Sequence, residues 1–129
     1  MASTRNKALH YLRAVWLNPV PGTRTLRSYS VEAYKILTSV SERTIERDSG
    51  QTLRTVAYRE TTGAVLIHLT ADTPGEHASV VPAAAPGIAE VGVRTVPPPN
   101  DAEFMDGDAF IHIVGNDVCV CMSSCAKGR

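Results

Sequence analysis

The residues best suited to chemistry lie near the carboxyl end of the sequence, where Cys119, Cys121 and Cys125 follow His112. Thiolate sulfur and imidazole nitrogen are ligands that zinc prefers, and four of them can form a tetrahedral site. The spacing argues against zinc, because the cysteines form no Cys-x-x-Cys pair and sit among apolar residues. Cysteine and histidine in an apolar strand are more often packed, and no cationic neighbour in sequence would activate a thiol. We expect these residues to be metal-free and reduced.

A second group consists of four acids in a short segment: Asp101, Glu103, Asp106 and Asp108. Carboxylate oxygens at close spacing suit calcium or magnesium. The segment does not follow the twelve-residue calcium-loop pattern, and Asp106-Gly107-Asp108 is typical of a turn that precedes a strand. We therefore predict neither a metal site nor a cofactor.

A third group, Arg24, Arg27, Ser28 and Ser30, lies just ahead of a predicted helix. The free N–H groups and the dipole at a helix N-terminus attract anions, so these residues are a candidate site for the phosphate of a nucleic acid. The alternative is that the arginines are solvated loop residues. The sequence contains no phosphate-binding glycine motif and no aromatic RNA-binding motif.

No catalytic motif accompanies these groups. Ser123 and Ser124 are not part of a Gly-x-Ser-x-Gly elbow, there is no His-Glu-x-x-His motif, and the four histidines are scattered. We predict that the protein is not an enzyme.

A β-hairpin over residues 109–122 positions His112 and the cysteines. Two apolar runs flank Gly115-Asn116, a pair that favours a two-residue turn. This turn places Val114 opposite Asp117 and His112 opposite Cys119. One face of the hairpin then carries Phe110, His112, Val114, Cys119 and Cys121, and the other face is apolar enough to be core. A three-residue turn would shift the pairing by one residue and separate His112 from the cysteines.

The remaining elements must support this hairpin. Alternating apolar residues predict strands at 51–60 and 64–70, joined as a hairpin that puts Val56 and Tyr58 on one face with Val65, Ile67 and Leu69. Shorter strands are predicted at 77–82 and 88–96. Residues 7–17 fit a strand or a helix, and we favour the strand.

One helix is predicted from about residue 31 to residues 42–45, capped by Ser30 and with Glu32 in its first turn. An apolar stripe at helical spacing would cover one face of the sheet: Ala33, Ile36, Leu37, Val40 and Thr44. The predicted fold class is therefore α+β, an antiparallel sheet of five or six strands with one main helix (about 31–45) on one face and a closing hairpin at 109–122.

The chain has 129 residues, of which 43% are hydrophobic and 20% charged, which suits one globular domain. We expect residues 1–129 to form a single α+β domain, and an end soon after the last strand fits the amino-terminal domain of a longer protein. No apolar run approaches the ~20 residues of a membrane helix. Since the first residues lack a secretory signal and three cysteines is an odd number, we predict a cytoplasmic protein with no membrane partner.

The net charge of zero conceals a division along the sequence. Residues 1–60 carry ten basic and five acidic side chains, whereas residues 61–129 carry three and eight. The two halves can form complementary patches between copies, can offer a basic surface to nucleic acid, or can interleave in space so that the charges cancel.

Both faces of the predicted hairpin are largely apolar, so we expect it to be covered on both sides or to offer one side to a partner. The leading hypothesis is a non-catalytic interaction or assembly domain, either a homodimer or a domain that docks other domains of the same chain. The competing hypothesis is nucleic-acid binding or sensing through the basic first half. The hairpin at 109–122 resembles the amino-terminal domains of bacterial antiviral defence proteins, a resemblance that would place such sensing in antiviral defence and carries no residue role across.

Overall fold

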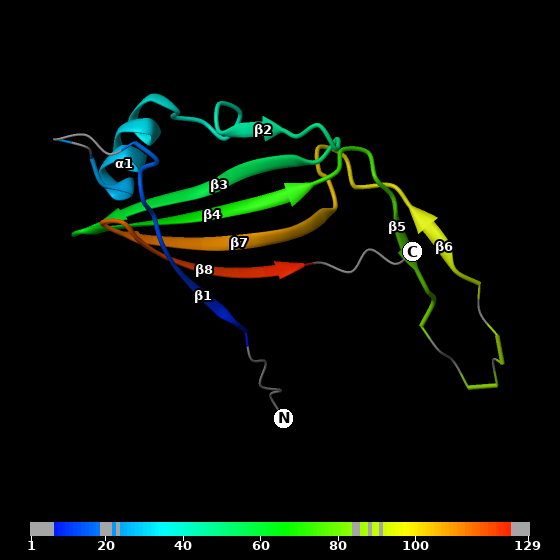
Figure 1. Cartoon of the computed structure of the whole chain (residues 1–129). Helices are drawn as coiled ribbons and strands as arrows, with labels where there is room; N and C mark the ends of the chain where they lie inside the picture. Colours follow the sequence, from blue (N-terminus) through cyan, green and yellow to red (C-terminus); the bar gives the residue numbers. More distant parts are fainter. Residues whose placement is uncertain are drawn as a thin grey trace.

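The computed structural model describes residues 7–18, 22, 24–83, 86–87, 89–90 and 92–124. Within these residues the chain forms one helix and eight strands (Figure 1). In chain order they are β1 (Leu9–Arg13), α1 (Leu26–Ile36), β2 (Thr44–Glu46), β3 (Thr52–Thr61), β4 (Ala64–Asp72), β5 (Ala78–Val80), β6 (Arg94–Val96), β7 (Met105–Val114) and β8 (Asp117–Ser124). No helix in this part of the chain has the length and apolar character needed to cross a membrane.

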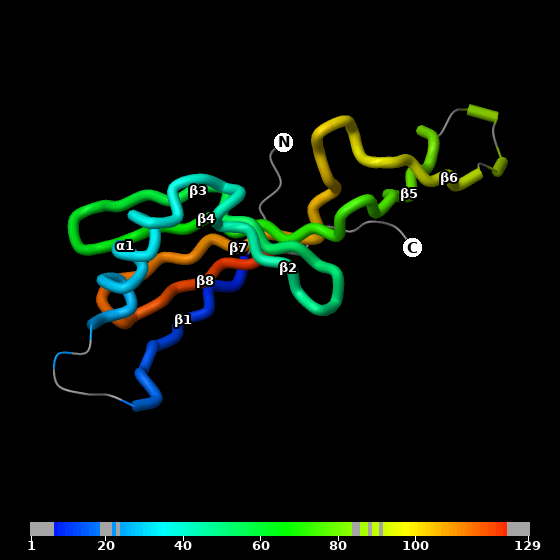
Figure 2. Tube along the Cα trace, turned by 90° about the horizontal axis from the view of Figure 1, so that it is seen from above, coloured from blue at the N-terminus to red at the C-terminus, as the bar shows by residue number. Residues whose placement is uncertain are grey.

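Six of the strands form one antiparallel sheet in the order β1-β8-β7-β4-β3-β2, and β5 and β6 form a separate two-stranded sheet. The helix lies at the end of the large sheet where the β3–β4 and β7–β8 turns meet, and β5 and β6 project beyond the opposite end (Figures 1 and 2). One helix on an antiparallel sheet is the predicted α+β class, which is confirmed.

The β7–β8 hairpin has the predicted register. His112 pairs with Cys119, Phe110 with Cys121, and Val114 with Asp117 next to the two-residue turn. Gly115 has φ 60° and Asn116 is not among the residues with positive φ, which is the pattern of a type II′ turn with glycine in the first central position. Because side chains alternate along a strand, this register fixes which residues share a face.

The β3–β4 hairpin is also confirmed, but one detail is wrong. Tyr58 pairs with Ile67, whereas the register shifts between Thr55 and Ala57 and leaves Val56 out of the ladder. A bulge inserts one residue and changes the face on which the following side chains lie. Val56 therefore does not share the face of Tyr58 and is 40% exposed.

The helix begins and ends earlier than predicted. Thr25, not Ser30, is the N-cap, and its hydroxyl accepts a hydrogen bond from the Ser28 N–H at 3.2 Å. Ser30 is instead a buried residue within the helix. The apolar stripe that was predicted to cover the sheet is not the side of the helix that packs on it, since its member Ile36 is 76% exposed.

A local turn explains why the helix does not continue to residue 45. The Glu42 N–H donates to the Ser39 hydroxyl, and the Glu42 carboxylate accepts from Ser39 and from the Thr38 N–H. These reciprocal bonds resemble a helix-capping box and satisfy the backbone outside a helix. Thr44–Glu46 then forms β2, an edge strand that the helical spacing concealed.

The core lies between α1 and the turn end of the sheet. The buried cluster consists of Val65, Ile67, Ile113 and Val118, and partly buried residues that pack against it include Leu26, Val31 and Tyr34 of α1. Tyr34 stacks on Tyr58, with ring centroids 4.3 Å apart, and its hydroxyl lies 2.9 Å from the Thr55 hydroxyl. Burial and a hydrogen bond to Glu60 raise the pKa of Tyr58 to about 12.

The three remaining predicted strands, at 7–17, 77–82 and 88–96, agree with the structure to different degrees. The preferred strand at 7–17 is confirmed as β1, and the segment at 77–82 contains β5. The strand predicted at 88–96 is reduced to Arg94–Val96, and residues 88 and 91 lie outside the described residues. Gly92 and the prolines after Val96 leave little sequence for regular pairing.

Candidate interaction surface

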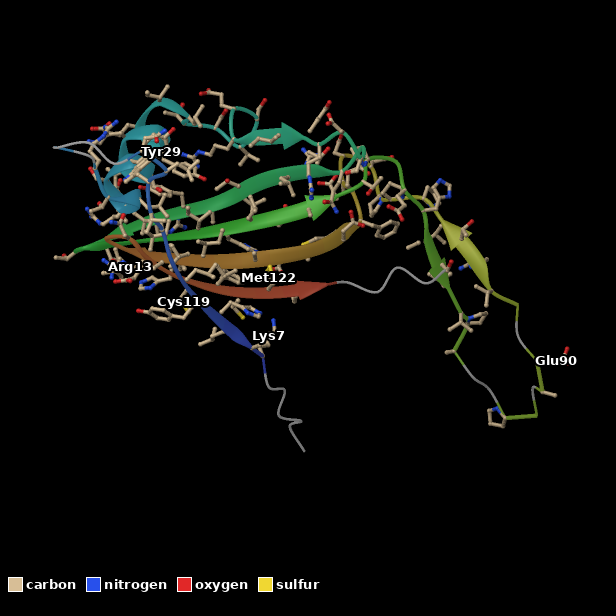
Figure 3. The ribbon with its side chains drawn as sticks, in the orientation of Figure 1. Lys7, Arg13, Tyr29, Glu90, Cys119 and Met122 are labelled. Atoms are coloured by element: carbon tan, nitrogen blue, oxygen red, sulfur yellow. The ribbon has the colours of Figure 1, made fainter. Side chains whose placement is uncertain are left out.

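The face of the large sheet opposite α1 carries two rows of side chains that cross five strands. The strand registers define the first row as Leu9, Cys121, Phe110, His68 and Ala57, and the second row as Tyr11, Cys119, His112, Leu66 and Arg59. We call these ten residues, together with Val114, the open face. Figure 3 labels Cys119 on this face and Met122, which belongs to the face that α1 partly covers.

The large apolar side chains of the open face are accessible. The exposed fractions are 68% for Leu9, 76% for Tyr11, 38% for Leu66, 43% for Phe110 and 46% for Val114. The helix packs instead on the cluster around Val65 and Ile113. Among the described residues, no helix or strand therefore covers the open face.

The predicted interface residues are thus brought together. Phe110, His112, Val114, Cys119 and Cys121 lie on one face, in the register that the two-residue turn requires. Cys119 and Cys121 are free thiols of intermediate exposure, and His112 is exposed. Within the described residues no group of three or more His, Cys, Asp or Glu side chains could hold a metal ion, and Cys125 lies outside that part of the chain.

A polar cluster borders the open face at the end away from the β7–β8 turn. Phe110 stacks on His68, with ring centroids 4.1 Å apart and planes 8° from parallel. His68 Nε2 lies 2.8 Å from one oxygen of Asp108, and the Ser123 hydroxyl donates to the other oxygen. The hydroxyl of Ser123, and then His68, lower the pKa of Asp108, against the effect of burial.

This cluster contains the residue types of a hydrolase but not their arrangement. A nucleophilic serine needs a base within hydrogen-bond distance of its hydroxyl. Here Asp108 lies between Ser123 and His68, so the hydroxyl donates to a carboxylate of lowered pKa, which is a poor base at neutral pH. The arrangement holds the His68 ring against Phe110, and it supports a positioning role.

The candidate anion site at the helix N-terminus has its amides engaged by protein atoms. The Leu26 N–H donates to Asn116 Oδ1 at 2.8 Å, the Arg27 N–H to the Gly115 carbonyl at 3.0 Å, and the Ser28 N–H to Thr25. The β7–β8 turn therefore caps α1. These amides are not free for a phosphate.

The arginines of that site also have contacts. Arg24 forms an ion pair with Glu32 and lies 5.9 Å from the Tyr29 ring centroid. Arg27 donates to the Thr61 carbonyl at 3.4 Å. Anion binding by Arg24, Arg27, Ser28 and Ser30 stays a prediction.

Three of the four acids in the segment 101–108 accept hydrogen bonds from different partners. Glu103 accepts from the Gly75 N–H at 2.8 Å, Asp106 accepts from Gln51 and Thr73, and Asp108 belongs to the polar cluster. Asp101, Glu103, Arg54 and Asp72 line an open pocket of about 540 Å³. Arg54 and Asp72 form an ion pair of 2.8 Å there, and this hydrogen bond raises the pKa of Arg54.

The basic and acidic halves of the sequence interleave. In the sheet order, β1 lies at one edge and β3 and β2 at the other, and between them lie β8, β7 and β4 from the acidic half. Two basic residues of the first half lie beside acids of the second half: Arg54 forms an ion pair with Asp72, and Arg13 pairs across the strands with Asp117. Within the large sheet, the division of charge along the sequence is therefore not a division into two separate groups of strands.

Sequence reasoning missed Leu9, Tyr11 and Leu66 as members of the open face. Their strands were predicted, but strand order was not, so the neighbours of the hairpin were unknown. The alternation of Leu9 and Tyr11, and of Leu66 and His68, was the available signal. No known protein family, curated protein or solved structure matches this chain.

Proposed function

We propose that this protein is a non-catalytic assembly domain that self-associates through its open face. The observation that supports the proposal is that five exposed apolar side chains lie on one side of the sheet, with the cysteines and His112 among them: Leu9, Tyr11, Phe110, Leu66 and Val114. Single exposed apolar residues are ordinary on protein surfaces, whereas a contiguous apolar patch marks an interaction site.

The chemistry of the open face favours a second copy of the chain as its partner. Its two rows contain one side chain that is charged at every physiological pH, Arg59, and in the adjoining row of Val114 the charge of Arg13 lies opposite that of Asp117, so a polyanion would find little net charge to neutralise there. A partner must instead present apolar surface, and the open face of another copy does so. Isologous pairing about a two-fold axis is the commonest oligomer symmetry, and two sheets can pack face to face about 10 Å apart.

Sedimentation velocity over a wide concentration range tests the proposal with two matched lysine variants. Phe110→Lys puts a charge in the centre of the open face, and Ile36→Lys makes the same kind of change at an exposed residue on the outer side of α1. We expect the wild type and Ile36→Lys to associate with equal affinity. In Phe110→Lys, we expect the affinity of the open-face association to fall by roughly 30-fold or more.

Two results would overturn the proposal. One is a wild-type protein that stays monomeric at high micromolar concentration, and the other is a Phe110→Lys variant whose association equals that of Ile36→Lys. A gel shift distinguishes self-association from nucleic-acid binding. If a monomeric protein retains DNA or RNA, and the retention weakens steeply with salt, nucleic-acid binding is favoured.

A further inference from the structure

The outer edge of β1 is a second surface that differs in kind from the open face. β1 ends the six-stranded sheet, and among the described strands it pairs only with β8. All five of its residues are exposed. An edge strand presents a row of unpaired N–H and C=O groups that can pair with a strand from another chain.

One hydrogen bond identifies the backbone groups that point outward. The Ala14 N–H donates to the Asn116 carbonyl at 2.8 Å, directly beyond the Arg13–Asp117 pair. In an antiparallel ladder, hydrogen-bonded pairs alternate with pairs that lack these bonds. The backbone groups of His10 and Leu12 therefore face β8, and those pointing to the free edge belong to Leu9, Tyr11 and Arg13.

The two edges of the sheet differ in their protection. β2, at the other edge, has three residues, and a short edge strand offers few groups for pairing. β1 has five residues, contains no proline and no register shift, and has Arg13 as its only residue that is always charged. Apart from the charge of Arg13 at its end, β1 lacks the usual devices that prevent pairing at an edge.

We propose that β1 pairs with β1 of a second copy, antiparallel and with the two-fold axis at Tyr11. In this register Leu9 lies opposite Arg13 of the second copy and Tyr11 lies opposite Tyr11. All three outward residues then stand in hydrogen-bonded pairs. A register centred on Arg13 would oppose two arginines, and one centred on Leu9 would place Tyr11 and Arg13 opposite residues that lie outside β1 of the second copy.

This contact goes beyond the self-association proposed for the open face. A two-fold axis through an antiparallel strand pair is perpendicular to the sheet, so the two open faces lie on the same side of one continuous sheet and stay uncovered. The edge and the open face are therefore independent contacts, and each can fail without the other. A chain that uses both forms assemblies larger than a dimer.

The experiment isolates the edge by working in the Phe110→Lys background, in which the open-face contact is removed. Tyr11→Pro deletes the outward N–H, a change that an edge position tolerates, whereas Tyr11→Ala removes the ring and keeps the N–H. In sedimentation velocity we expect Phe110→Lys and Phe110→Lys/Tyr11→Ala to form dimers and Phe110→Lys/Tyr11→Pro to be monomeric.

Amide hydrogen exchange supplies the second measurement and confirms that β1 remains folded. In Phe110→Lys, we expect the amides of Tyr11 and Arg13 to exchange about tenfold or more slowly at high than at low protein concentration, because pairing protects them. Protection of His10 and Leu12, which already face β8, should not change with concentration, and should persist in the proline variant.

The outcomes separate the two proposals. A strictly monomeric Phe110→Lys protein, or equal association of the Tyr11→Pro and Tyr11→Ala variants, overturns edge pairing and leaves the open-face contact intact. Wild-type association that neither Phe110→Lys nor Tyr11→Ala weakens, but Tyr11→Pro abolishes, overturns the open-face proposal and supports the edge. Concentration-independent exchange of Tyr11 and Arg13 overturns edge pairing by itself.

Discussion

The two faces of the β7–β8 hairpin have comparable apolar content but different surroundings. Ile113 and Val118 are buried under α1, whereas Phe110 and Val114, on the same strands, are exposed. The helix is capped by Asn116 and Gly115 of the turn, and it packs on the side that carries Ile113 and Val118. Because the two faces have comparable apolar content, hydrophobicity alone does not decide which face of a ribbon becomes core.

The helix is also too short to cover its own side completely. Eleven residues span about 16 Å, and α1 packs only at the turn end of the sheet. Farther along the same face, an open groove of about 230 Å³ has a lining that includes Leu53, Leu69, Ala109 and Met122. The covered face therefore has a packed half and an accessible half, whereas the open face has no covering element among the described residues.

The largest expected effect is on stability and contrasts two neighbouring residues of β7. Ile113→Ala should lower the free energy of unfolding by about 2–5 kcal/mol, because Ile113 is buried and its truncation leaves a cavity. Val114→Ala, on the open face, should cost less than about 1 kcal/mol. Urea unfolding of both variants measures the difference. Equal costs would contradict the assignment of one face to the core and the other to the surface.

A smaller effect tests the contact that anchors the helix. Asn116→Ala removes the acceptor of the Leu26 N–H and should cost about 1–2 kcal/mol, a value typical of a lost cap. Asn116→Asp keeps an oxygen in the same place and serves as the matched control. Urea unfolding followed by far-ultraviolet circular dichroism compares them. If both variants are as stable as the wild type, Asn116 does not decide where α1 packs.

The smallest stability effect concerns the polar border of the open face. Because Ser123 and His68 lower the pKa of Asp108 below its ordinary value of 3.8, ionised Asp108 stabilises the folded state at higher pH. That contribution is present above the pKa of the unfolded chain and is lost as the pH falls through the lower, folded pKa. As the pH falls from neutral to strongly acidic, the urea midpoint should decline less steeply in Asp108→Asn than in the wild type. Ser123→Ala should show a smaller change in the same direction. An unchanged acid decline in both variants would refute this role of Asp108.

Local sequence patterns predicted most of the strands, but they could not predict the order of the strands in the sheet. Gly115-Asn116 was sufficient to predict the pairing of His112 with Cys119, because a two-residue turn permits one register. The helix was misplaced because Ala33, Ile36 and Leu37 have helical spacing without packing on the sheet, whereas the capping contact to Asn116 lies 90 residues away in sequence. Long-range contacts of this kind leave no local signal.

The same limit applies to the interaction surface. The residues of β7 and β8 that form the open face were predicted as one set from alternation and turn geometry. Leu9 and Tyr11 joined them only when β1 was found beside β8. Which of the two apolar faces would stay uncovered depended on the position of α1, whose start at Leu26 the sequence pattern placed too late, at about residue 31.

The most direct test of the central claim uses Cys119 and Cys121 as probes within the open face. In a Cys125→Ser background, the rate at which a thiol reagent labels these two residues in the native protein is measured from low to high micromolar concentration. If the open faces associate, labelling of the wild type should be about tenfold slower at high than at low concentration. Phe110→Lys should be labelled at the same rate at all concentrations. Edge pairing through β1 alone would leave the thiols accessible and would not slow labelling. A wild-type labelling rate that does not change with concentration would contradict the account.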